Sequence, residues 1–146
     1  MSKPLTSEEF QEHHGAGSKA KATERSRRHE DLVTAVIGWL KLQIVNGQRV
    51  VAFRVDTGRH LAKRPGGPWE VGKAFGTKGA PDISGIIPGV GRRLDIDVKI
   101  GPDQLSDDQA AFFHEVRSRG GIALEVRDCL DSLIQQFPAA IQEARP

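Results

Sequence analysis

Cysteine, tyrosine and long apolar runs are what this chain lacks most. Of its 146 residues only Cys129 is a cysteine, so the chain can form neither an internal disulfide nor a thiolate-rich zinc site. No run approaches the roughly eighteen apolar residues of a membrane-spanning helix, and residues 1–30 contain no apolar leader. We therefore expect a soluble protein of the reducing cytoplasm with no membrane partner.

Aromatic residues are also scarce, at 5% of the sequence, so the core has to be built from Val, Ile, Leu and the six phenylalanines. A chain of this length supports one domain. We expect a flexible basic tail over residues 1–24 and a single domain over 25–146. His13 and His14 fall in that tail and are expected to be tail residues rather than ligands.

The hydrophobic periodicity predicts the order of the elements. Apolar residues at helical spacing between Val33 and Ile44 predict a helix from Ser26 to about Val45. Strands are expected over 49–55, 81–87 and 92–100, and the last two form a hairpin. Residues 58–68 are expected to be a loop, and 69–75 a short strand or a hairpin arm. Then follow a helix over 105–119 with Ser106 as its N-cap, a strand over 122–127, and a helix from 128 to about 136 that is interrupted near Pro138.

This order predicts an α/β fold with a small mixed sheet flanked by helices. A helix joins the strands over 92–100 and 122–127, and such a crossover makes them parallel neighbours. The apolar residues of the joining helix include Phe112 and Phe113, which we expect in the core.

The net charge is only +2, but the positive charge is unevenly distributed. Residues 17–28 carry five basic side chains and one acidic, and residues 54–78 carry six basic and two acidic. Such patches suit a phosphate backbone, although ordinary solvated surface charge is the alternative. The nucleic-acid contacts expected from the second patch are Arg54, Arg59, His60, Lys63, Arg64, Lys73 and Lys78. Trp69 could stack on a base, but we expect it in the core.

Carboxylates occur where strands normally avoid them. Asp82 follows Gly79-Ala80-Pro81, and Asp95, Asp97 and Lys99 alternate with Leu94, Ile96 and Val98. Alternate residues of a strand share a face, so Asp97 and Lys99 point the same way. Two carboxylates with waters and a phosphate are what Mg²⁺ prefers, which indicates metal-assisted phosphodiester hydrolysis. The alternative is an ordinary surface ion pair, and we expect Asp95 to be an edge charge rather than a spare ligand.

The ordered set of motifs resembles the PD-(D/E)XK nuclease superfamily, in particular its VRR-NUC branch, which is similar to Holliday junction resolvases. The motifs are Gly79-x-Pro81-Asp82, Asp97-Val98-Lys99, Leu105-Ser106-x-x-Gln109-x-x-Phe112 and Gly120-Gly121, with Phe53-Arg54-Val55-Asp56-Thr57-Gly58 upstream. The resemblance covers about Glu30 to Arg127. One departure is Asp97, where this branch more often has glutamate.

The resemblance implies a restriction-endonuclease-like core of order αβββαβ and a Mg²⁺-dependent nuclease, with Mn²⁺ as a substitute ion. Asp82, Asp97 and the backbone carbonyl of Val98 would hold the metal, and Lys99 would orient or activate a water. Further catalytic residues would be Glu30 on the first helix and Gln109 on the helix that follows Ser106.

Both of these helix residues have a simpler interpretation. Glu30 lies about 60° from the centre of the apolar stripe on a helical wheel, at the rim that faces the sheet. The simpler interpretation is a negative charge near the N-terminus of the helix that interacts only with the helix dipole. Asp31 falls on the solvent side. His29 could reach the site, although we expect it to be a packed histidine at the rim. Gln109 could instead complete a capping box with Ser106.

The expected function is a DNA endonuclease directed by structure, acting on branched, flapped or junction DNA in repair or recombination. A branched substrate would suit a homodimer. One alternative is a catalytically inactive nucleic-acid-binding subunit with the same fold. Another is an unrelated Mg²⁺-dependent phosphohydrolase acting on nucleotides, which the lack of a Gly-x-x-x-x-Gly-Lys loop disfavours.

Overall fold

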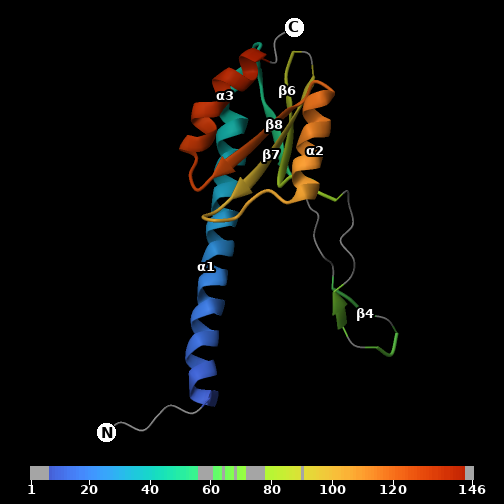
Figure 1. Cartoon of the computed structure of the whole chain (residues 1–146). Coiled ribbons are helices and arrows are strands. Elements are labelled where there is room, and N and C mark those ends of the chain that lie inside the picture. Colours follow the sequence, from blue (N-terminus) through green and yellow to red (C-terminus); the bar gives the residue numbers. More distant parts are fainter. Residues whose placement is uncertain are drawn as a thin grey trace.

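A computed structural model describes residues 7–55, 61–63, 65–67, 69–71, 78–89 and 91–143, of which 7–20, 61–63 and 69–71 are described by their backbone alone (Figure 1). The helices are α1 (Ser7–Leu42), α2 (Asp107–Ser118) and α3 (Asp131–Glu143). The strands are β1 (Ile44–Val45), β2 (Gln48–Arg49), β3 (Val51–Arg54), β4 (Leu61–Lys63), β5 (Trp69–Val71), β6 (Ile83–Ile87), β7 (Arg92–Lys99) and β8 (Ile122–Arg127).

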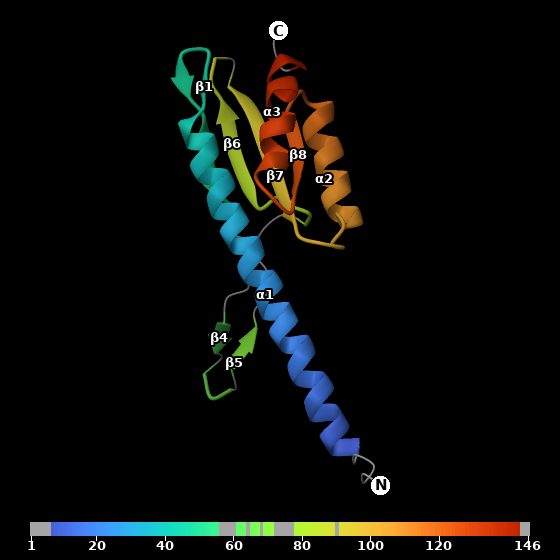
Figure 2. The same ribbon diagram turned by 90° about the vertical axis from the view of Figure 1, so that its left-hand side faces the viewer.

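Four strands form a mixed sheet in the order β3-β6-β7-β8. β3 pairs with β6 and β6 with β7 in antiparallel fashion, whereas β7 and β8 are parallel. Helices α1 and α3 pack on one face of this sheet and α2 packs on the other (Figures 1 and 2). The predicted α/β class, the β6–β7 hairpin and the parallel β7–β8 pair are therefore confirmed.

The main core lies between the sheet and the pair α1 and α3. On β7 the side chains of Leu94, Ile96 and Val98 are buried on this face, as period-2 alternation requires. From α1 the residues Val33, Val36 and Leu40 of the predicted stripe meet them, whereas Ile44 has left the helix and is exposed. A smaller apolar cluster lies under α2 and includes the buried Phe113, with Phe112 partly buried against it.

On the α2 face only part of the sheet is covered. Helix α2 contacts β7 and β8, while three apolar side chains of β3 and β6, namely Val51, Phe53 and Ile86, are exposed. Through the strand registers these residues share a face with Asp95 and Asp97. The site described below lies at the edge of this open half.

Helix α1 differs from its predicted boundaries at both ends. It begins at Ser7 rather than near Ser26, and its first half projects beyond the sheet (Figures 1 and 2). The backbone around His13 and His14 is therefore helical, and the division of the chain at residue 24 stays a prediction. The helix ends at Leu42 because Asn46 and Gly47 take positive φ angles of 50° and 77° in the turn of a β1–β2 hairpin.

Two further predictions were wrong in detail. The segment 58–68 was expected to be a loop throughout, but its residues Leu61–Lys63 form β4 and pair with β5 in a hairpin that lies apart from the main sheet (Figure 2). Helix α3 runs through Pro138 to Glu143 instead of stopping near Gln136. Its buried side chains Leu133, Phe137 and Ala140 anchor both sides of the proline, so packing outweighs the missing backbone donor.

Among the residues that the structure describes, no helix has the length and apolar character needed to cross a lipid bilayer.

Candidate functional site

Asp82 and Asp97 come together although 15 positions separate them in the sequence. Asp82 stands directly before β6, and Asp97 lies in β7, which pairs with β6. The backbone N–H of Asp82 donates to Oδ1 of Asp97 at 3.2 Å, and the two side chains also interact. The predicted convergence of these two carboxylates is therefore present in the fold.

The segment that carries Asp82 is fixed on both sides. Gly79 has a φ of +76°, and a Cβ there would lie 2.1 Å from the backbone oxygen of Asp108 in α2. Only glycine tolerates both the angle and the close approach. On the other side the carbonyl of Asp82 accepts from the N–H of Val55 at 2.9 Å.

Asp97 is an unusual carboxylate because it is fully buried and incompletely hydrogen-bonded. Its exposed fraction is 0%, and among the described residues its Oδ2 has no hydrogen-bond partner. Burial and the neighbouring charge of Asp82 raise the pKa of Asp97 from 3.8 to about 7, although the charge of Lys99 works in the opposite direction. A buried carboxylate oxygen without a hydrogen-bond partner is the kind of atom that a cation would satisfy.

Asp82 has a different environment, with its side chain 30% exposed. Its Oδ2 lies 3.2 Å from Nε2 of His29 in α1 and accepts the backbone N–H of Val98 at 2.9 Å. Burial would raise the pKa of Asp82, but these two donors hold it below its ordinary value. Asp82 is thus the ionised member of the pair, and Asp97 is the one that burial and repulsion keep protonated toward neutral pH.

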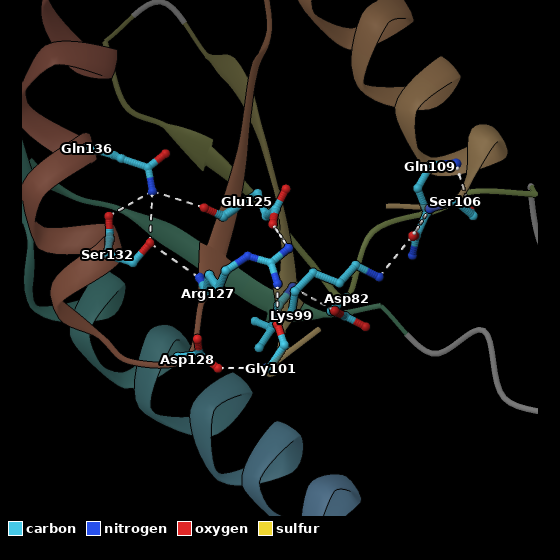
Figure 3. Close-up of polar contacts among 11 residues, drawn as sticks. Asp82, Lys99, Gly101, Ser106, Gln109, Glu125, Arg127, Asp128, Ser132 and Gln136 are labelled. Carbon is cyan, nitrogen blue, oxygen red and sulfur yellow. Dashed lines mark hydrogen bonds and ion pairs between the residues drawn. The ribbon is translucent and has the colours of Figure 1, made fainter. Parts of the chain in front are cut away.

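Lys99 extends from the end of β7 toward the start of α2 (Figure 3). Its Nζ donates to Oε1 of Gln109 at 2.9 Å, and the same oxygen accepts the backbone N–H of Ser106 at 2.9 Å. The N–H of Gln109 in turn donates to Oγ of Ser106 at 3.2 Å. The capping box and the contact with the site were alternatives for Gln109 in the sequence, and the structure combines them in one side chain.

The prediction for Asp95 was wrong. Instead of an edge charge it is a buried residue with an exposed fraction of 0%. Ser84, which pairs with Asp95 on the neighbouring strand β6, donates a short hydrogen bond to Oδ1, and Nε of Arg93 lies 2.6 Å from Oδ2. The strand is interior rather than an edge, since β8 pairs with its other side.

Glu30 and Arg54 do not take the places expected of them. Glu30 is exposed and forms an ion pair with Arg54, so this arginine of the predicted nucleic-acid surface is joined to α1. Oε1 of Glu30 also lies 3.7 Å from Nδ1 of His29. The α1 side chain that contacts Asp82 is therefore His29, for which reaching the site was the less favoured of two expectations, while Asp31 is exposed as predicted.

Sequence reasoning missed two charged residues of β8. In the parallel register Glu125 lies beside Asp97 and Arg127 beside Lys99, and the two β8 side chains form an ion pair. Arg127 also donates to the carbonyl of Gly101 at 2.7 Å, in a polar network that extends to Gln136 of α3 (Figure 3). The alternation Ala123, Glu125, Arg127 places all three on the α2 face, and this was the available signal.

Several predicted nucleic-acid contacts lie outside the described residues. This applies to Arg59, His60, Arg64 and Lys73, and to the side chain of Lys63. The side chain of Trp69, which was expected in the core, also lies outside them. Lys78 is described and is exposed beside the Gly79 turn.

The capacity of the site for a metal rests on two carboxylates. Among the described residues there is no group of three or more His, Cys, Asp or Glu side chains placed to hold a metal ion. Mg²⁺ commonly takes only one or two protein carboxylates and completes its shell with water and substrate phosphate. The N–H of Val98 points toward Asp82, and because the N–H and C=O of one strand residue share a side, we expect its carbonyl to face the same way.

Comparisons of the chain with protein-family models, with curated proteins and with solved structures gave no match.

Proposed function

We propose that this protein is a Mg²⁺-dependent nuclease that hydrolyses phosphodiester bonds in DNA, with a restriction-endonuclease-like core. The observation that carries the proposal is the pairing of Asp82 with the buried Asp97, whose Oδ2 has no hydrogen-bond partner among the described residues. A divalent cation would supply the missing positive partner and remove the repulsion that raises the pKa of Asp97. The resemblance of the motif order to the VRR-NUC branch is the second support.

In this proposal Asp82, Asp97 and the carbonyl of Val98 hold the cation. When bound, the cation polarises the phosphodiester and lowers the pKa of a coordinated water. Lys99 is held by Gln109 and presents its ammonium group to the developing negative charge or to the attacking water. Water adds to phosphorus, the bond to one ester oxygen breaks, and that oxygen leaves with a proton.

Positive charge on the described surface supports a nucleic-acid substrate. The exposed part of α1 carries Lys21, Arg27 and Arg28, and Lys78 lies at the turn before Asp82. Basic side chains of this kind bind the phosphate backbone with affinity that falls as salt increases and with little sequence readout. We propose branched, flapped or junction DNA as the substrate, and repair or recombination as the setting.

The test is a cleavage assay on labelled single-stranded, duplex, flapped and four-way DNA, with Mg²⁺ and then with EDTA. We expect cleavage of at least one branched substrate with Mg²⁺ and none with EDTA. Asp97→Ala should bind DNA and cut it about 10³-fold more slowly, because it loses several kcal/mol of metal-dependent stabilisation. Asp31→Asn, on the exposed side of α1, is the matched control and should cut normally.

Binding of DNA by the unchanged protein without cleavage under any of these conditions would contradict the proposal. That result would instead select the alternative of an inactive nucleic-acid-binding subunit.

A further inference from the structure

Helix α1 contributes one side chain to the carboxylate pair, and it is a histidine. Nε2 of His29 lies 3.2 Å from Oδ2 of Asp82, and the histidine side chain is 31% exposed. Glu30, the residue expected from the resemblance, turns away to Arg54 on β3. The contact between α1 and the carboxylate pair is therefore made by His29.

Each ring nitrogen of His29 lies near a carboxylate. On one side Nε2 meets Asp82, and on the other Nδ1 lies 3.7 Å from Oε1 of Glu30, which is itself held by Arg54. The hydrogen bond to Asp82 and the nearby carboxylates raise the pKa of His29, against the effect of burial. The ring therefore lies between the carboxylates of Glu30 and Asp82, and Arg54 forms an ion pair with the first of them.

Asp82 needs such support more than Asp97 does. Its side chain is partly exposed, and a free aspartate at the start of a strand would sample several rotamers. The backbone N–H of Val98 and the imidazole of His29 both act on Oδ2, which leaves Oδ1 for a cation. Two donors on one oxygen hold the carboxylate in a single orientation.

We propose that His29 is a positioning residue of the metal site, which orients the Asp82 carboxylate, and that Glu30 and Arg54 serve the site only by holding His29. The inference rests on the proposed function, since it assumes that Asp82 binds a cation. In metal sites, partners that hydrogen-bond a ligand typically contribute about 10- to 100-fold in metal affinity.

The experiment measures the Kd for Mn²⁺ by electron paramagnetic resonance at pH 8.5, where imidazole is ordinarily neutral and acts through its N–H. The variants are His29→Ala, His29→Gln and, as the matched control, His114→Ala, which removes an exposed histidine of α2. Alanine favours helix, so His29→Ala keeps α1, and the unfolding midpoint in EDTA checks this. Glutamine keeps an N–H donor near the position of Nε2.

We expect His29→Ala to weaken Mn²⁺ binding about tenfold or more, His29→Gln to restore most of the affinity, and His114→Ala to change nothing. In the DNA assay at saturating Mn²⁺, His29→Ala should recover most of its cleavage rate, which a damaged fold would not allow.

Wild-type affinity in His29→Ala would overturn the positioning role and leave the proposed function standing. A glutamine variant as weak as the alanine variant, with both folded, would also overturn it, because the N–H would then not be the group that matters. If the unchanged protein binds no Mn²⁺, the metal site itself is wrong and the inference falls with it.

Discussion

Asp95 and Asp97 lie two residues apart on β7, on the same face of the sheet and with the same exposed fraction of 0%, yet their surroundings are opposite. Asp95 meets Ser84 and Arg93, and both of its oxygens have donors. Asp97 meets Asp82, a second negative group, and one of its oxygens has no donor among the described residues. The first carboxylate is part of the fold's internal bonding, and the second has the features of a ligand.

This difference arises from what lies opposite each residue in the sheet. Asp95 is paired with Ser84 of β6, whose small hydroxyl group can donate to it. Arg93, which lies on β7 like Asp95 itself, can also reach the carboxylate. Strand β6 begins at Ile83, which pairs with Ile96. The neighbour of Asp97 is therefore Asp82, which precedes the strand. Burial alone therefore does not distinguish the two carboxylates, whereas the missing hydrogen-bond partner of Asp97 does.

The largest predicted effect comes from the turn that holds Asp82. Gly79→Ala should lower the free energy of unfolding by about 2–4 kcal/mol, because it combines a positive φ with a backbone clash against Asp108. The substitution should displace Asp82, the partner of Asp97, and leave the surroundings of Asp95 unchanged. Urea unfolding gives the magnitude, and DNA cleavage should fall more than stability explains.

Gly47→Ala is the control for Gly79→Ala, since Gly47 also has a positive φ but an added Cβ meets open space. If both variants lose the same stability, the close approach to α2 contributes nothing.

The second prediction separates the two carboxylates by their pH dependence. The raised pKa of Asp97 means that the folded state keeps this proton above the pH at which the unfolded chain releases it. The wild-type stability in EDTA should therefore fall as pH rises from about 4 to about 7. Asp97→Asn cannot lose that proton and should be about 1–3 kcal/mol more stable than wild type at pH 8.

Asp95→Asn should behave in the opposite way at pH 8. It places an amide N–H₂ against Arg93, and we expect a loss of about 1–2 kcal/mol. Urea unfolding at pH 5 and pH 8 measures both variants. If Asp97→Asn is the less stable of the two variants at pH 8, the described difference between Asp95 and Asp97 is wrong.

The sequence was sufficient to predict the pairing of β7 with its neighbours, but not to predict which partners the charged side chains contact. Alternation in Leu94–Lys99 and the crossover helix predicted β7, β8 and their parallel pairing, because period and connection are local properties. It could not show that Arg93 turns back onto Asp95, or that Glu30 prefers Arg54 and leaves His29 to Asp82. Such choices depend on side-chain partners from other elements.

The predicted ends of the helices were wrong for a similar reason. A proline normally limits a helix, but Phe137 and Ala140 are held in the core and carry α3 past Pro138. The helix predicted to run to about Val45 ends at Leu42, and the Asn46-Gly47 pair that follows has the sequence favoured in the hairpin turn that it forms.

The smallest predicted effect concerns Gln109. Gln109→Ala removes the acceptor of both the Ser106 N–H and the Lys99 ammonium, and we expect a loss of about 0.5–1.5 kcal/mol in stability. Gln109→Glu keeps the capping box and adds a charge to the contact with Lys99, so its stability should stay within about 0.5 kcal/mol of wild type. Thermal unfolding measures both, and equal losses would show that the amide oxygen is not the group that matters.

The most direct test of the proposed metal site is a Mn²⁺ titration of the ¹⁵N-labelled protein followed by NMR. In wild type and in Asp95→Asn, the backbone signals of residues 82, 97 and 98 should broaden first. In Asp97→Asn that local broadening should require a much higher Mn²⁺ concentration. Broadening that is unchanged in Asp97→Asn, or that never centres on these residues, would contradict the account.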